Sequence, residues 1–190
     1  MVSDMDTMVD DATAQVAQVI RVERETRGWS QADLAGRSGV SKAMISKIER
    51  QDASPTAVIL ARIAAAFELT LAMLLTRAEG TRHVAARSQP VWRDPESGYV
   101  RRQLFASSSC PIELVSVELP ARARVDFPAS TYRFIRQVVW LMKGHLVIED
   151  GGDRCELGPG DAYAFGEPAD ASFENERAAA CRYLVAVSRR

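Results

Sequence analysis

The chain is poor in cysteine. It has three, Cys110, Cys155 and Cys181, at scattered positions with no CxxC spacing. A disulfide framework or a structural zinc site needs paired or closely spaced cysteines, so this distribution argues against both. We expect the three side chains to act as small buried hydrophobic groups.

Long apolar runs are also missing. No segment is hydrophobic for long enough to span a bilayer, and the first residues, MVSDMDTMVDD, are acidic where a secretory signal would be basic. We therefore expect a cytoplasmic protein with no membrane partner. At 190 residues and 47% hydrophobic residues, the chain has room for two small domains, each with its own core.

What the chain does contain is a pair of short amphipathic helices over residues 30–50, SQADLAGRSGVSKAMISKIER. Ser30 is a good N-cap with Asp33 three residues later, and Gly39 can adopt the positive φ that ends a helix. Ser41 can cap a second helix. The inward apolar residues of that helix recur three and four apart, at Met44 or Ile45 and at Ile48. Two helices joined by a tight glycine turn are typical of a helix-turn-helix that binds a DNA major groove.

Residues 16–75 resemble the phage-repressor (XRE-like) type of helix-turn-helix transcriptional regulator. The features that carry the resemblance fall in register: Gly28, Ser30, Gln31, Ala35, Gly39, the ISKIE run at 45–49, and Pro55. The resemblance implies that residues 41–50 form the recognition helix. One departure is Gln51, where the family commonly has a glycine.

DNA contacts are then expected from the outward face of this helix. Lys42 and Lys47 are expected to read bases, because lysine can bond to O6 and N7 of guanine, and Ala43 can contact a thymine methyl. The alternative is that the lysines only form a solvated face. By resemblance, Gln31 binds a backbone phosphate. The predicted DNA-binding set is Gln31, Arg37, Ser41, Lys42, Ala43, Ser46, Lys47 and Arg50, with Arg37 and Arg50 on phosphates.

The resemblance also implies an ion pair between Arg24 on the first helix and Glu49 at the end of the recognition helix. A partly buried pair would position the recognition helix, although its net stabilisation is small because both charges lose water. The alternative is an exposed salt bridge that contributes less than about 1 kcal/mol.

Helical periodicity predicts a five-helix all-α bundle over residues 12–78. Ser54 with Pro55 is expected to open its fourth helix, and Thr70 to cap its fifth. The acidic residues before the bundle are expected to form a frayed tail.

The net charge of −1 is low for a protein that binds DNA, but the basic residues are concentrated. Between residues 21 and 62, eight basic residues (Arg21, Arg24, Arg27, Arg37, Lys42, Lys47, Arg50, Arg62) stand against five acidic ones (Glu23, Glu25, Asp33, Glu49, Asp52). We expect modest nonspecific affinity for double-stranded DNA, and specific binding of a homodimer to a palindromic operator.

The pattern changes after residue 80. Residues 79–99 are polar and contain two prolines, which indicates a linker that partly packs on the C-terminal domain. Over residues 100–188 the apolar period becomes two. The strand candidates are VRRQLF, IELVSVEL, ARARVDF, RFIRQVVWLM, HLVIED, RCELG, AYAF and CRYLVAV. Many short strands predict a sandwich or barrel, so the whole chain is expected to be an α+β multidomain protein.

The run VVWLMKGHLVIEDGGDRCELGPGDAYAF resembles the cupin fold, a small jelly-roll barrel. The resemblance is carried by a strand ending at Gly144 with another strand after it, and by the turn Pro159, Gly160, Asp161. A phage-repressor helix-turn-helix followed by a cupin is a known regulator architecture. It implies a sensor or dimerisation domain over residues 100–188.

Metal-binding cupins resemble one another in three histidines and a glutamate, and this chain departs from that set. The glutamate position is Gln137, the upstream histidine positions fall among residues 130–133, and the third falls at Ala171 or Ser172. The only histidines are His83 and His145. A tight transition-metal site needs several converging imidazole or carboxylate groups, so we expect no metal, no cofactor and no catalytic residues.

Strand alternation suggests what binds instead. If Gln137 points into the barrel, Arg133 shares its face, and an arginine in an apolar cavity favours a planar anion such as a carboxylate. We expect a small anionic or polar effector, contacted also by Tyr132 or Tyr163. The alternative is that Arg133 lies at the rim and pairs with a surface acid such as Asp126 or Asp170.

The opposite face of the same strand is unusually apolar. Phe134, Val138, Trp140 and Met142 need cover, which we expect from the linker and a partner subunit. Of the function classes, a dimeric transcriptional regulator is favoured. An antitoxin-like protein whose barrel binds another protein is the alternative, and a DNA-tethered cupin enzyme is disfavoured because ligands and a nucleophile with a base are missing.

Overall fold

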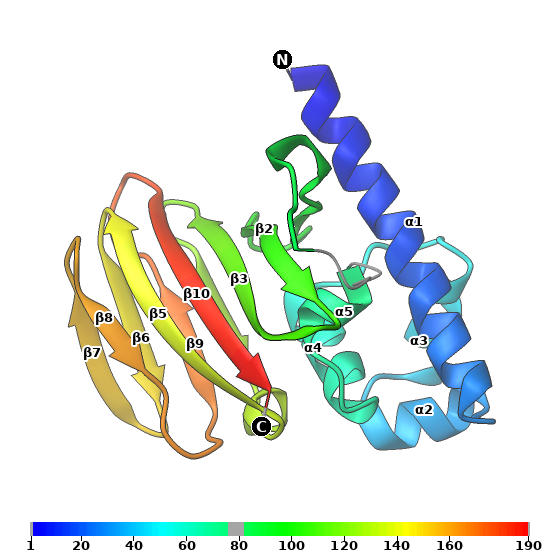
Figure 1. Cartoon of the computed structure of the whole chain (residues 1–190). Coiled ribbons are helices and arrows are strands. Elements are labelled where there is room, and N and C mark those ends of the chain that lie inside the picture. The colour runs from blue at the N-terminus through cyan, green and yellow to red at the C-terminus, as the bar shows by residue number, and fades with distance from the viewer. Residues whose placement is uncertain (1, 76–81, 190) are drawn as a thin grey trace.

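The computed structural model describes residues 2–75 and 82–189, with side chains from residue 14 onward. The expected boundary between bundle and linker, at residues 78 and 79, lies outside the described residues. Figure 1 shows the helices on one side and the strands on the other, in two sheets. The helices are α1 (Val2–Thr26), α2 (Gln31–Ser38), α3 (Lys42–Glu49), α4 (Ala57–Ala66) and α5 (Leu71–Leu75). The five expected helices are therefore present.

Local capping explains the ends of α2 and α3. The Ser30 hydroxyl accepts from the backbone N–H of Asp33, and the Asp33 carboxylate accepts in return from the N–H of Ser30. Gly39 ends α2 in the left-handed conformation, with φ 66°. The Ser41 hydroxyl accepts from the N–H of Met44 at the start of α3. These caps confirm the expected helix starts and the turn.

Two helix starts differ from expectation. Thr56, not Ser54, caps α4, because its hydroxyl accepts from the N–H of Ile59. Helix α1 begins at Val2, so the acidic segment expected to fray continues the helix. That segment contains neither proline nor glycine, and nothing in it ends a helix.

Ten antiparallel strands form the second half. They are β1 (Val91–Arg93), β2 (Val100–Ser107), β3 (Cys110–Leu119), β4 (Arg124–Phe127), β5 (Ile135–Lys143), β6 (Leu146–Asp150), β7 (Asp153–Leu157), β8 (Ala162–Ala164), β9 (Ala171–Glu174) and β10 (Cys181–Arg189), with 3-10 turns η1 (Ala86–Ser88) and η2 (Ala129–Tyr132). One sheet has the order β1-β2-β3-β10-β5-β8 and the other β4-β9-β6-β7. Apolar residues from both sheets belong to one buried cluster together with those of the helices, so the two halves do not have the separate cores that were expected.

Strand β5 shows the expected alternation over most of its length. Gln137, Val139 and Leu141 are buried, whereas Val138 and Trp140 are exposed. The alternation does not extend back to residue 133, because the strand begins at residue 135 and the preceding segment is the turn η2.

The two halves are in direct contact. Helix α1 contacts β1, α4 contacts β4 and η2, and α5 contacts β2. Two hydrogen bonds join them: Asp94 Oδ1 accepts from the N–H of Ala57 at 2.9 Å, and Thr70 Oγ1 donates to Glu113 Oε1 at 2.9 Å. The segment expected to be a linker therefore contributes β1 to the six-stranded sheet, and its Asp94 accepts a hydrogen bond from the start of α4.

The remaining expectations from composition have mixed outcomes. Cys181 is buried, but Cys110 and Cys155 are only partly buried, so the expectation holds for one of the three. Within residues 2–75 and 82–189, none of the helices combines the length and apolar character that crossing a membrane requires.

Candidate nucleic-acid interface and interior cavity

Helix α3 presents a polar face to solvent and an apolar face to the bundle. Ile45 and Ile48 are fully buried, while Lys42, Ala43 and Lys47 are exposed. Figure 1 shows α4 and α5 between the sheets and helices α2 and α3. The main contacts between the sheets and the bundle are made by α1, α4 and α5, and the outward residues of α3 stay exposed.

The structure contains the Arg24–Glu49 pair that the resemblance implied. Arg24 Nε donates to Glu49 Oε1 at 2.6 Å and Nη2 donates to Oε2 at 3.0 Å, a bidentate pair. The side chains are 12% and 5% exposed. Burial alone would raise the pKa of Glu49, but hydrogen bonds from Arg24 and Gln31 outweigh it and hold that pKa below its usual value. The pair thus ties α1 to the end of α3.

Three predicted phosphate contacts have partners within the protein. Gln31 Nε2 donates to Glu49 Oε2 at 2.9 Å, which leaves its carbonyl end and one amide hydrogen for a ligand. The Arg37 guanidinium lies 4.3 Å from the ring centroid of Trp29, which holds it at the surface. Arg50 donates to Ser46 Oγ at 2.7 Å and to Asp52 at 2.8 Å, so DNA would have to compete for it. Their roles on DNA stay predictions.

The turn after α3 keeps its geometry without the family's glycine. Gln51 has φ 63°, in the left-handed region where glycine is favoured. Its N–H donates to the carbonyl of Ile48, and the N–H of Asp52 donates to that of Lys47. The departure seen in the sequence therefore alters a residue but not the backbone path.

The four residues predicted to bind an effector do not come together. Gln137 and Tyr132 are buried and line an interior cavity of about 70 Å³. Arg133 lies outside it, exposed at the end of η2, and is in no ion pair among the described residues, so neither of its expected partners is found. Tyr163 donates to Asp150 and lies outside the cavity lining.

The cavity instead contains a different arginine and a carboxylate. Arg101 on β2 and Glu113 on β3 are 7% and 3% exposed, and both line it. Burial raises the pKa of Glu113 above its usual value, against the lowering effects of the hydrogen bond from Thr70 and the nearby charge of Arg101. Glu113 could have been found from the sequence, because it occupies the apolar face of β3 with Val115 and Val117.

The donors at this place do not fit a metal. Gln137, Tyr132 and Thr131 offer an amide and two hydroxyl groups, and Glu113 is the single carboxylate of the lining, so the several imidazole or carboxylate groups that a transition metal needs are not present. Among the described side chains there is no group of three or more His, Cys, Asp or Glu that could hold an ion. The chemistry of this cavity is therefore that of hydrogen bonds and buried charge.

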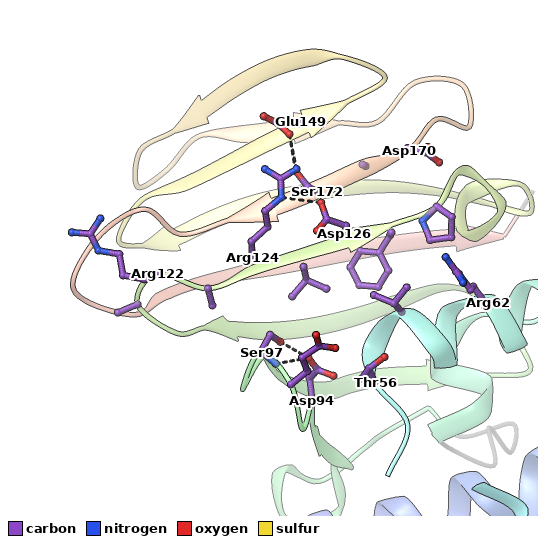
Figure 2. A pocket seen from close by; sticks show the side chains of 18 of the residues that line it. Thr56, Arg62, Asp94, Ser97, Arg122, Arg124, Asp126, Glu149, Asp170 and Ser172 are labelled. Atoms are coloured by element: carbon purple, nitrogen blue, oxygen red, sulfur yellow. Dashed lines mark hydrogen bonds and ion pairs between the residues drawn. The ribbon is translucent and has the colours of Figure 1, made fainter. Parts of the chain in front are cut away.

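A second hollow, of about 980 Å³, lies between the start of α4 and the four-stranded sheet (Figure 2). Three of its charged residues, Arg124, Asp126 and Glu149, pair with one another. Arg124 pairs with Asp126, Glu149 and Glu174 at 2.7–3.0 Å. Asp94 accepts from the N–H of Ser97 as well as from α4. The groove thus lies where α4 meets the four-stranded sheet.

Large apolar side chains on the outer face of the six-stranded sheet are about half exposed among the described residues. Val138, Trp140 and Met142 are 43–46% exposed, and Ile112 is 49% exposed. The linker was expected to cover part of this face, but its strand β1 pairs with β2 at the opposite edge of the sheet. That expectation is wrong, because β1 extends the sheet instead of folding over it.

Residues 20–74 match the HTH_3 helix-turn-helix family. A 41-residue stretch, 22% of this chain, is 54% identical to the HTH-type transcriptional regulator SutR of Escherichia coli (strain K12). The match spans 23% of the length of that curated relative.

Among solved structures, an HTH_3 family transcriptional regulator from Vibrio cholerae is similar with a TM-score of 0.78 and 19% identity, over 94% of this chain and 97% of that one. The two proteins therefore share a fold across both halves. The Cupin_2 domain of an XRE family transcriptional regulator from Enterobacter cloacae also matches, with 16% identity over 47% of this chain and 95% of that one, at a TM-score of 0.43.

Proposed function

Because the N-terminal part of this chain is an XRE-type helix-turn-helix domain, we propose that the protein is a sequence-specific, DNA-binding transcriptional regulator and not an enzyme. The observation that carries the proposal is the exposed face of α3, with Lys42, Ala43 and Lys47 outward and Ile45 and Ile48 in the core. A short, rigidly held helix with basic outward residues is what major-groove recognition needs.

The test is direct binding of DNA by the purified full chain. Selection from a random duplex library should enrich a palindromic sequence, and Lys47→Ala should lower affinity for that operator by about 1–3 kcal/mol while random DNA loses less. An equal loss on both would make Lys47 a phosphate contact. Arg177→Ala is the matched control, because Arg177 is exposed in the loop between β9 and β10 and belongs neither to α3 nor to the outer face of the six-stranded sheet. Failure to enrich any sequence would refute the proposal.

We also propose that the regulator acts as a homodimer through the outer face of the six-stranded sheet. Two recognition helices on a palindrome need a two-fold assembly, and the exposed apolar side chains of Val138, Trp140 and Met142 supply a surface that water disfavours. Trp140→Glu should convert the dimer to a monomer in sedimentation equilibrium. A monomeric wild type, or a variant that still dimerises, would contradict this interface, and a different bound protein would favour an antitoxin-like role.

The sheet half is proposed to bind a small polar effector without a metal. Support comes from the interior cavity, where buried polar groups lie beside residues of α4 and α5. A molecule bound there would contact both halves and could change how the recognition helices are held. Stabilisation of the folded chain by such a molecule in thermal unfolding, with altered operator affinity, is the measurement that checks it.

A further inference from the structure

Buried polar atoms without a partner are concentrated at one place in this protein. Seven buried side-chain nitrogen or oxygen atoms have no hydrogen-bond partner among the described residues. Five of them belong to residues that line the interior cavity: Arg101 Nε, Glu113 Oε2, Thr131 Oγ1, Tyr132 OH and Gln137 Nε2. Each such atom costs about 1–3 kcal/mol if it stays unsatisfied. Such a cluster is what a site for a polar ligand looks like.

The donors in this cluster outnumber the acceptors. Arg101 is a cation with its Nε–H unused, since its hydrogen bond to Gln103, at 3.2 Å, runs from Nη2. Gln137 offers an amide N–H. Burial raises the pKa of Tyr132 against the lowering effect of the neighbouring Gln137 side chain, so its hydroxyl keeps its proton at neutral pH and can donate. Several donors and one positive charge match an anion with two acceptor oxygens, which is a carboxylate.

Glu113 requires a hydrogen-bond donor on the ligand. Its Oε1 accepts from Thr70, and its Oε2 has no partner. Arg101 and Glu113 form no ion pair with each other among the described residues, although both line the cavity. A ligand that satisfies both must carry a hydrogen-bond donor next to its carboxylate.

The cavity limits the size of such a ligand. Its volume is about 70 Å³, well below the roughly 300 Å³ at which sites for drug-sized molecules begin. Apolar residues from both halves, including Ala61, Ala64 and Val187, line it around the polar cluster. Only a molecule of a few non-hydrogen atoms fits.

We propose that this cavity binds a small α-hydroxy or α-amino acid, with its carboxylate on Arg101, Gln137 and Tyr132 and its hydroxyl or amino group on Glu113. The inference rests on the proposed regulatory function only for its biological meaning. Because Glu113 also accepts from Thr70 at the start of α5, a bound ligand reinforces the contact between the sheet and the DNA-binding half.

Thermal unfolding of the full chain tests the ligand class. Glycolate and lactate, or glycine and alanine, should raise the Tm by about 5 °C at saturation, and the pair that does so distinguishes the hydroxyl from the amino ligand. Acetate, which lacks the donor, and ethylene glycol, which lacks the carboxylate, should shift it by less than about 1 °C. Equal shifts with acetate, or no shift with any of the four acids, would overturn the proposal.

Variants locate the site. Arg101→Met should reduce the affinity of the active acid at least tenfold, whereas Arg133→Met, which removes an exposed arginine outside the cavity, should leave it unchanged. If Arg101→Met does not fold, Tyr132→Phe removes one of the proposed carboxylate donors at almost constant volume and should weaken binding several-fold. Unchanged affinity in the folded cavity variant, or equal loss in Arg133→Met, would place the ligand elsewhere.

Operator binding by the same preparations separates this inference from the proposed function. If the protein retains the selected duplex but does not respond to the acids, the proposed regulatory function holds and the proposed cavity ligand is refuted. A thermal response that depends on Arg101, in a chain that retains no duplex, would establish the cavity ligand and refute the regulator.

Discussion

The two halves of the molecule bury the same two chemical groups in different ways. In the helical half, Arg24 and Glu49 meet in a bidentate pair that Gln31 completes. In the cavity, Arg101 and Glu113 each keep an atom without a partner. The first arrangement is complete within the protein and ties α1 to α3, whereas the second would be completed by the ligand that we propose. Buried charge thus serves a structural contact in one half and, in our proposal, ligand binding in the other.

The two carboxylates also respond to pH in opposite directions. The pKa of Glu49 is lowered in the folded state, so its contribution to stability is present above the ordinary value and is lost as the pH falls through the folded pKa. The pKa of Glu113 is raised, so the folded state loses stability as the pH rises from the ordinary value through the folded pKa. Lowering the pH therefore weakens the Arg24–Glu49 pair and removes the unfavourable buried charge of Glu113.

The largest expected effect comes from breaking the completed pair. Arg24→Met leaves Glu49 buried with Gln31 alone, and we expect the free energy of unfolding at neutral pH to fall by about 3 kcal/mol in urea titration. Operator affinity should fall with it, because α3 loses its attachment to α1. A loss under about 1 kcal/mol would mean that the pair behaves as an exposed salt bridge.

Removing the unpaired charge of Glu113 should raise the free energy of unfolding. Glu113→Gln keeps an acceptor for Thr70 and removes the buried negative charge, so we expect a gain of about 2 kcal/mol at neutral pH. The gain should vanish below the ordinary carboxyl pKa, where both proteins are neutral at this position. Urea titrations across that pH range check it, and a pH-independent difference would show that charge is not the cause.

A smaller effect is expected from Gln31, the third member of the buried cluster with Arg24 and Glu49. Gln31→Met removes one hydrogen bond to Glu49 while Arg24 remains, and stability should fall by about 1 kcal/mol in the same titration. If Gln31 also binds a phosphate, operator affinity will fall by more than stability explains. Unchanged stability would show that the Arg24 pair alone completes the cluster.

The smallest effect supplies the matched control on the same helix. Arg21 pairs with Glu25 one turn away, and both side chains are more than half exposed. Arg21→Met should change the free energy of unfolding by less than about 0.5 kcal/mol, because water screens the pair. A loss comparable to that of Arg24→Met would remove the distinction between buried and exposed pairs on α1.

Sequence reasoning succeeded where the signal is local. Ser30, Gly39 and Ser41 act through neighbours within four residues, so the helix-turn-helix could be predicted in detail. The alternation of β5 placed Gln137 inside for the same reason. It failed at Arg133, since a short 3-10 turn breaks the period of two just before the strand.

Which residues line the cavity could be learned only from the folded structure. Arg101 and Glu113 lie on different strands, Thr131 and Tyr132 on a turn, and the closing residues on α4 and α5, and no spacing in the chain relates these segments. The amino-acid sequence by itself determined the caps, the apolar faces and the basic surface of α3, because these depend on side chains a few residues apart. Only the tertiary structure decided which polar groups would be buried together without partners, because burial is a property of how distant segments pack.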